Sequence, residues 1–110
     1  MALSQAVIRM NYQKAISQAN RLEDLARQLR NLAQHNLDGT LTNINRAWSG
    51  EAANVFLSKG VKAKDDMIRT ANSIDNTARA IRRAAEVVRA ADLRAMEIAR
   101  RASGGGGRHY

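Results

Sequence analysis

The 110-residue chain contains no cysteine and no proline, and its aromatic residues are one Trp, two Tyr and one Phe. The missing cysteines exclude a disulfide scaffold, an iron–sulfur centre and any thiolate zinc site. The missing prolines, together with 20 alanines, favour long uninterrupted helices over a sheet. Because the chain is short and poor in large aromatics, we expect one domain that completes its core against a second copy or another protein.

No constellation of catalytic or metal-ligating residues is recognisable. His35 has Asp38 as its nearest carboxylate in sequence, and His109 stands next to the last residue. Catalytic and metal sites need several convergent groups. We therefore expect a non-enzymatic protein with no cofactor and no metal, and we place His35 at the surface or at an interface.

Long apolar runs are also missing. No run of about 18 apolar residues occurs, so no membrane span is expected. The first ten residues lack the cationic start and apolar stretch of a signal peptide. These absences by themselves predict a cytosolic protein, and export by a route that accepts folded proteins is compatible with them.

The net charge is +8, and residues 76–110 carry eight basic and three acidic side chains. Such a basic segment suits nucleic acid, an anionic membrane, an acidic protein or simply a solvated helix face. The arginines that would line a phosphate-binding stripe are Arg79, Arg82, Arg83, Arg89, Arg94, Arg100 and Arg101. No aromatic is interleaved for base stacking, and alanine dominates where a membrane-surface helix needs bulky apolar residues. A basic helical nucleic-acid-binding protein is retained as the alternative function.

An apolar stripe with spacings of four and three runs through the first part of the chain, as in a helix with one buried face. Its members are Ile8, Tyr12, Ala15, Ala19, Leu22, Ala26, Leu29 and Ala33, and it is widened later by Leu25, Leu32, Leu37, Leu41 and Ile44. The dipeptide Asp38-Gly39 is of the turn type and is a candidate kink or break, but the stripe resumes at Leu41. The pattern predicts a first helix over about residues 4–46.

Two interlocked seven-residue series mark the second part of the chain. One series is Gly60, Met67, Ile74, Ile81, Val88 and Ala95, and the other is Ala71, Ala78, Ala85, Asp92 and Ala99. This pattern is typical of coiled-coil-like packing, in which the alanines allow close approach and the larger residues act as knobs. It predicts a second helix over about residues 51–102. Ser103 and the four glycines after it predict a flexible tail over residues 103–110.

Only residues 47–50 separate the two helical patterns. A connection this short predicts an antiparallel hairpin over residues 1–102, so the expected fold class is all-α. Since each helix of a hairpin buries one face, two hairpins would pair into a four-helix bundle. The expected packing interface consists of Leu22, Leu29, Met67, Ile74, Ile81 and Val88.

Trp48 is the only tryptophan and stands at the predicted tip of the hairpin. We expect it to plug the open end of the bundle with Leu41, Ile44 and Phe56 beside it, and a role at a partner surface is compatible with that place. Gly50 suits a sharp reversal, because glycine accepts a positive φ or a close approach of the Trp ring.

The segment from Trp48 to Phe56 reads WSGEAANVF and resembles the central signature of the WXG family, the Esx-type proteins of the type VII (ESX) secretion system. The family pattern is Trp, any residue, Gly, then small residues and an aromatic. Leu41 and Ile44 match its apolar positions before the Trp. The resemblance covers residues 5–100 and places Trp48, Gly50, Phe56, Leu41 and Ile44 in the turn and partner-binding motif.

The resemblance implies a helical hairpin with the Trp-x-Gly segment in the turn, paired into a homodimer or a heterodimer with a WXG or LXG-type helical protein. It implies export in the folded state, without a signal peptide, from the bacterial cytoplasm to the cell surface or medium. The implied function is that of a secreted substrate, or of an adaptor that escorts an LXG-type toxin to the secretion ATPase. Roles in virulence or interbacterial competition follow from the same resemblance.

The family's export signal is typically Tyr, three residues, then Asp or Glu. The only Tyr after the turn is Tyr110, and the nearest matches run from Val88 to Asp92 and from Leu93 to Glu97. These are the candidate export-signal residues, and the missing Tyr suggests that the partner carries the signal or that the system is divergent. The basic C-terminal helix is unusual for the family, and an acidic partner helix, such as the leader of an LXG-type toxin, would explain it.

Overall fold

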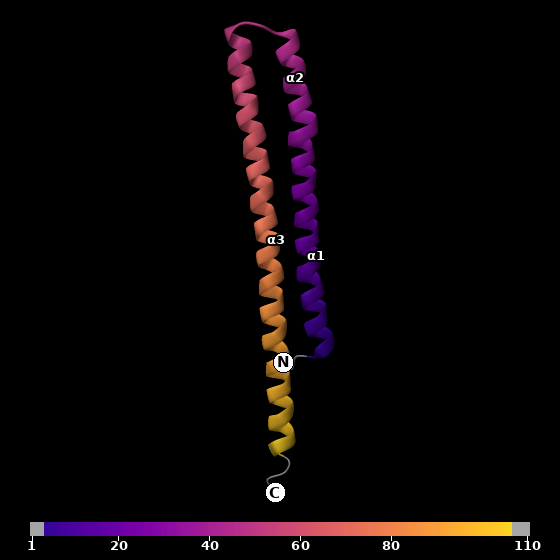
Figure 1. Cartoon of the computed structure of the whole chain (residues 1–110). Helices are drawn as coiled ribbons and strands as arrows, with labels where there is room; N and C mark the ends of the chain where they lie inside the picture. Colours follow the sequence, from indigo (N-terminus) through magenta and orange to yellow (C-terminus); the bar gives the residue numbers. More distant parts are fainter. Residues whose placement is uncertain (1–3, 107–110) are drawn as a thin grey trace. The chain divides into compact units, whose positions relative to one another are not determined.

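The computed structural model describes residues 4–106, and every regular element in that range is a helix (Figure 1). The elements are α1 (Gln5–Asn31), the π-helix η1 (Leu32–Leu37), α2 (Asp38–Ala47) and α3 (Glu51–Gly106). The all-α prediction is confirmed over these residues. The chain divides into two compact units, to which α1 and α3 both contribute. Unit 1 comprises residues 1–20 and 79–110, and unit 2 comprises residues 21–78.

The second helix is longer than the sequence predicts. We expected it to end near Ala102, but α3 continues through Ser103 and Gly104 to Gly106. Glycine in a helix costs only about 1 kcal/mol relative to alanine, and extending an existing helix avoids the cost of nucleation. The rest of the predicted tail, residues 107–110 with His109 and Tyr110, lies outside the described residues.

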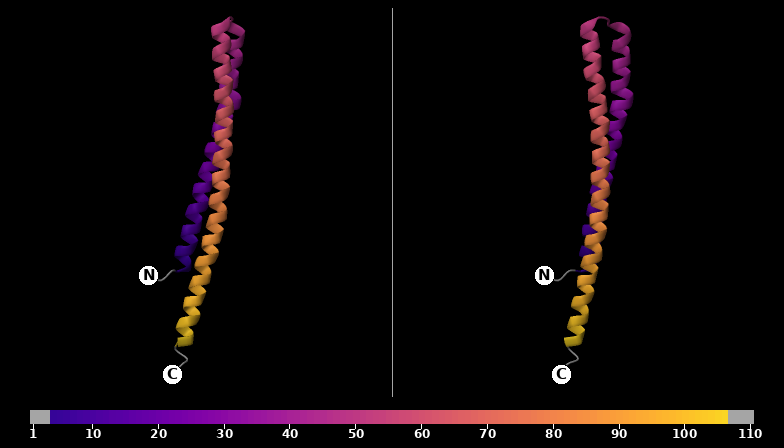
Figure 2. Two further views of the ribbon diagram at one scale, coloured as in Figure 1. Left: turned by 90° about the vertical axis from the view of Figure 1, so that its left-hand side faces the viewer. Right: turned by 60° about the vertical axis from the view of Figure 1, so that its left-hand side comes forward.

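Unit 2 is an antiparallel helix pair. The first part of α3 lies beside three segments: the end of α1, all of η1 and all of α2. Both views of Figure 2 show this arrangement. The buried residues of this unit are mostly alanines: Ala26, Ala33, Leu41, Ala53, Ala71 and Ala78. Small side chains along the seam let the two backbones approach closely, so the predicted alanine seam is confirmed here.

The helix does not break at Asp38-Gly39. Instead the backbone widens just before it, and the Asp38 N–H donates to the carbonyl of Ala33, five residues back. The buried positions Ala19, Ala26 and Ala33 are seven residues apart, whereas Leu41 follows after eight. A π-helical turn holds more residues than an α-turn, so it absorbs the extra residue and returns Leu41 to the inner face.

Gly60 fits closely against Leu41, which is almost fully buried. A Cβ added at Gly60 would lie 3.2 Å from Cδ1 and 3.3 Å from Cγ of Leu41, and closer still to Cδ2. The sequence placed Gly60 in the series of knobs, but the structure makes it the hole that receives Leu41. The absence of a side chain is the reason, because any β-carbon would occupy the same space.

Polar contacts link the two helices of unit 2. The Arg30 guanidinium forms an ion pair with Asp75 and donates to the side-chain oxygen of Asn72 at 2.8 Å. The Lys64 ammonium lies 3.0 Å from Asp38. Both ion pairs join residues far apart in sequence, so they hold the two helices in one register.

Unit 1 is a second antiparallel pair, in which the first part of α1 lies beside the orange part of α3, and the yellow end of α3 extends past the start of α1 (Figure 1). The Ser4 hydroxyl caps α1 by accepting a hydrogen bond from the Val7 N–H at 3.1 Å. Ile8, Ala19 and Ala85 are its buried apolar residues. No large side chain is fully buried anywhere in the described part of the chain. The helices therefore bury small residues and leave most large ones partly in solvent.

Candidate partner-binding surfaces

Three residues connect α2 to α3, and their backbone explains the Gly50 position. Trp48 is extended (φ −112°, ψ 146°), and its N–H closes α2 by donating to the Ile44 carbonyl at 2.8 Å. Gly50 has φ +100°, and its carbonyl accepts from the Asn54 N–H at 3.2 Å, which begins α3. A Cβ at Gly50 would meet nothing within 4 Å. Glycine is therefore required for its positive φ and not for room beside the Trp ring.

Trp48 is exposed in the single chain. Its side chain remains 57% exposed, and its ring lies near that of Phe56, with centroids 6.0 Å apart and planes tilted by 48°. Phe56 is itself half exposed, Ile44 is half-buried, and Leu41 is directed into the seam at Gly60. The predicted plug belongs to a bundle of two hairpins, so it stays a prediction; within the described residues of one chain, both rings remain about half exposed. The result is an exposed aromatic pair at the α2–α3 connection.

Unit 1 contains an open groove of about 260 Å³ between its two helices. The exposed surface of the groove is almost entirely apolar, although polar residues contribute to its walls. The lining residues are Ile8, Asn11, Tyr12, Ala15, Ile81, Ala84, Ala85, Val88, Arg89 and Asp92. Val88 is more than half exposed on its wall. An open apolar groove of this kind can receive the apolar face of an amphipathic helix.

A polar cluster ties the two helices of unit 1 together beside this groove. The guanidinium carbon of Arg89 lies 4.2 Å from the centre of the Tyr12 ring, and Arg89 also donates to both oxygens of Glu86 at 2.7 and 2.6 Å. A hydrogen bond between Tyr12 and Glu86 raises the pKa of the tyrosine and lowers the pKa of the carboxyl group. The sequence does not predict this cluster, because the spacing of Tyr12 marks it only as a member of the apolar stripe.

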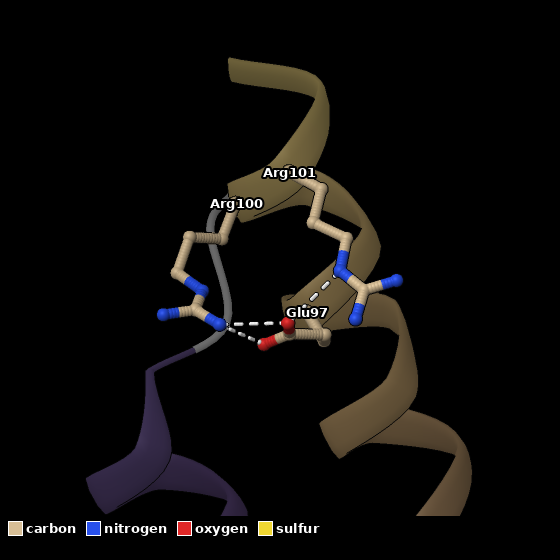
Figure 3. A network of polar contacts seen from close by, with 3 residues as sticks. All are labelled: Glu97, Arg100 and Arg101. Atoms are coloured by element: carbon tan, nitrogen blue, oxygen red, sulfur yellow. Dashed lines mark hydrogen bonds and ion pairs between the residues drawn. The ribbon is translucent and has the colours of Figure 1, made fainter. Parts of the chain in front are cut away.

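The candidate export-signal residues fall into two environments of unit 1. Val88 and Asp92 line the groove, and Asp92 is half-buried there. Leu93 is exposed, and Glu97 accepts hydrogen bonds from Arg100 at 2.7 and 2.6 Å and from Arg101 at 3.1 Å (Figure 3). The hydrogen bond from Arg100 is the main reason that the pKa of Glu97 lies below its ordinary value. The two pairs therefore differ in their acids: Glu97 is hydrogen-bonded to arginines of its own helix, whereas Asp92 faces the groove.

The residues predicted for the packing interface flank the alanine seams. Leu22, Leu29, Met67 and Ile74 are half-buried in unit 2, and Ile81 is half-buried in unit 1, where Val88 is exposed. A second hollow, in unit 2, is lined by Leu32, Asn36, Leu37, Thr40 and Met67. Other large apolar side chains remain exposed as well: Leu25, Leu32, Val87 and Ile98. The half-buried state of the predicted residues leaves part of each side chain available to a partner.

Several of the arginines after residue 78 form hydrogen bonds with other side chains. Arg89, Arg100 and Arg101 bind glutamates one turn away, and Arg82 donates to the side-chain oxygen of Asn20. His35 lies exposed in η1. Within residues 4–106 no group of His, Asp or Glu is placed to hold a metal ion. No helix of that same range has the length and hydropathy needed to cross a bilayer.

A family model described as WXG100, proteins of 100 residues with WXG, matches residues 7–93 of the chain. The match spans both units and includes the aromatic pair and the groove. No curated protein and no solved structure matches the chain.

Proposed function

Since the chain belongs to the WXG100 family, whose small helical proteins are associated with type VII secretion, we propose that it is a non-enzymatic substrate or adaptor of such a system. In this role it dimerises with another WXG or LXG-type helical protein and leaves the cytoplasm folded, without a signal peptide. As an adaptor it would escort an LXG-type toxin to the secretion ATPase.

The dimer is supported by where the large apolar side chains lie. The described core consists of alanines with Ile8 and Leu41, while Leu25, Leu32 and Val87 are about half exposed or more. Exposed apolar area of this kind mostly marks an interaction surface. Two helical pairs packed face to face would cover it, which is the geometry of a four-helix bundle.

The exposed aromatic pair is the observation that carries the proposal. Trp48 and Phe56 meet at the connection between two helices, and both rings keep an open face. Trp is among the residues that contribute most to the binding energy of protein interfaces, so an exposed Trp–Phe pair supports a partner-binding role. The pair therefore provides the surface by which a secretion component or a partner chain engages this protein.

The test is export of the full chain from a bacterium with an active type VII system, comparing wild type with Trp48→Ala. We expect the variant to accumulate in the cytoplasm and to disappear from the medium. Its helicity should stay close to wild type, because the Trp ring is more than half exposed. Trp48→Phe keeps an aromatic face and should restore part of the export.

Two controls make the result decisive. Val61→Ala also truncates an exposed apolar residue on α3 and should leave export unchanged. Deleting the secretion ATPase should stop export of wild type and Val61→Ala alike. Export of wild type in the absence of the ATPase, or full export of Trp48→Ala, would contradict the proposal.

A further inference from the structure

The charges of α3 are sorted to one side within unit 1. At about 100° per residue, the seven arginines from Arg79 to Arg101 fall on one arc of about 140°. The opposite arc, of similar width, is apolar from residue 80 to residue 102 apart from Asp92, and most of its members are alanines. This part of α3 is therefore amphipathic in addition to the seam that it buries against α1.

The apolar arc opens onto the groove of unit 1. Ile81, Ala84 and Val88 belong to this arc and also form the α3 wall of the groove. Val87 and Ile98 extend the arc and are 68% and 60% exposed. Alanines between these residues keep the surface shallow, so a third helix can lie against it at close range.

Cations border this apolar surface on both sides. Arg83 and Arg94 are eleven residues apart, or about three helical turns, and stand in one row at the outer edge of the apolar arc. On α1, Lys14 follows the groove-lining Asn11 by three residues, which places it about 60° further round the helix, away from the α1–α3 seam. All three side chains are exposed, and none forms an ion pair within the described residues. An occupant with carboxylates along both edges would pair with them.

A second copy of the chain fits this surface poorly. Residues 1–20 and 79–110 carry ten basic and three acidic side chains, which leaves unit 1 with a net charge of +7. Two such surfaces brought together would set arginine against arginine. Unit 2 has eight basic and seven acidic side chains and a net charge of +1, so unit 2 of a second copy would not attract unit 1 by its charge. Like charges across an interface select against that pairing.

We propose that the groove of unit 1 binds an acidic amphipathic helix of a different protein, with the apolar face of that helix on Ile81 and Val88 and its carboxylates beside Lys14, Arg83 and Arg94. The inference deepens the proposed function, because it assigns the partner its chemistry and its place. The choice of a foreign acidic helix over a second copy follows from the charge of unit 1, whatever secretion route the chain uses.

The first experiment uses two labelled synthetic peptides of about four helical turns with the same leucine face. One carries glutamates along both flanks, and the matched peptide carries lysines at those positions. Binding to the full chain is followed by fluorescence anisotropy in low and high salt. We expect the acidic peptide to bind at least about tenfold more tightly than the basic peptide, with the difference shrinking as salt screens the charges.

Variants locate the binding surface. Arg83→Glu combined with Arg94→Glu should weaken the acidic peptide by about tenfold or more and improve the basic peptide. The matched control, Lys59→Glu combined with Lys62→Glu, makes the same charge change in unit 2 and should leave binding within about twofold. Val88→Ser should weaken both peptides, since it removes apolar contact without changing charge. Asp92→Asn should not weaken the acidic peptide, because it removes the one acid that lines the groove.

Three results would overturn the inference. Equal affinity for the two peptides would remove the charge selection. A chain that sediments as a homodimer of about 24 kDa, twice the 12.1 kDa of one chain, and binds neither peptide would make a second copy the occupant. Binding to anionic phosphatidylserine vesicles that the Arg83→Glu, Arg94→Glu variant loses, with no binding of the acidic peptide, would make the surface a membrane contact. Failure of the peptide test with ATPase-dependent export intact overturns this inference alone, and the reverse pattern overturns only the proposed function.

Discussion

The two units of this chain use the same alanine-seam packing but handle charge in opposite ways. Unit 2 has nearly equal numbers of acids and bases, and its helices are joined by the Arg30–Asp75 and Lys64–Asp38 ion pairs. In unit 1 the α1 segment contributes Arg9 and Lys14 and no acid, so the ion pairs of that unit run along α3. In unit 2 the acids and bases pair with each other, whereas the excess positive charge of unit 1 attracts an acidic partner.

The difference also appears in the groups that join the helices. Unit 1 relies on the Tyr12, Glu86 and Arg89 cluster and on the bond from Arg82 to Asn20. Arg89 stacks on the Tyr12 ring and binds one acid, Glu86, while Arg82 binds the uncharged Asn20. These contacts neutralise little of the positive charge of unit 1. The two units therefore share the alanine seam and differ in the polar contacts that cross it.

The largest expected effect tests the packing of unit 2. Gly60→Val should destabilise the chain by about 1–3 kcal/mol, because its β-carbon would occupy the space of the Leu41 side chain. Thermal unfolding followed by circular dichroism measures this loss. Gly39→Ala is the matched control: it also replaces a helical glycine but meets nothing within 4 Å, so it should stabilise by about 0.5–1 kcal/mol. Equal stabilisation by both changes would refute the tight fit.

The second effect tests the balanced charges. Arg30→Ala should cost about 1–2 kcal/mol, because it leaves Asp75 without its partner where both side chains are about three-quarters buried. Arg27→Ala, which removes an exposed pair within one helix, should cost at most about 0.5 kcal/mol. Urea denaturation of both variants gives the comparison. A cycle with Asp75→Asn that shows no coupling would mean that this ion pair does not hold the helices together.

The third effect tests the polar cluster of unit 1 through pH. In the folded chain the pKa of Glu86 is lowered, first by the hydrogen bond from Tyr12 and then by Arg89. Its contribution to stability is therefore present above the ordinary carboxyl value of 4.5 and is lost as the pH falls through the lower folded value. Tyr12→Phe should bring the pKa of Glu86 closer to 4.5 and shrink this acid-dependent loss. Side-chain NMR titration measures the shift, and an unchanged Glu86 titration in the variant would argue against the hydrogen bond.

The smallest effect concerns charges that lie along one helix. Glu97→Gln removes the acceptor of Arg100 and Arg101 on the surface of α3 (Figure 3). We expect a melting temperature within experimental error of wild type, because exposed pairs one turn apart are well solvated and screened. A loss as large as that of Arg30→Ala would erase the distinction between pairs within a helix and pairs between helices.

Much of the fold could be predicted from the apolar spacing. The alanines at seven-residue intervals were expected to allow close helix approach, and Ala71, Ala78 and Ala85 are buried. A helix start at Ser4 was expected, and Ser4 caps α1. The glycines after Ser103 predict a helix end near Ala102, whereas the helix continues to Gly106. Turn-type residues lower helix stability only slightly, and a long helix tolerates them.

The candidate sites were harder to predict. The sequence predicts that Trp48 is covered within a bundle of two hairpins, and this stays a prediction, because in the single chain the ring is exposed and its cover depends on a partner. The eight-residue step from Ala33 to Leu41 was a usable signal for a change of helical turn that the sequence analysis did not exploit. The role of Gly60 depends on a residue of another helix, so no local pattern could have assigned it.

The helical class, the alanine seams and the excess of positive charge follow from the residues alone, because they depend on composition and on spacing along one helix. Three contacts follow only from the packing of the helices: Gly60 receives Leu41, Arg30 reaches Asp75, and Arg89 covers Tyr12. These contacts join residues 19 to 77 positions apart in sequence. Their geometry depends on how two helices are set against each other, which periodicity within either helix does not specify.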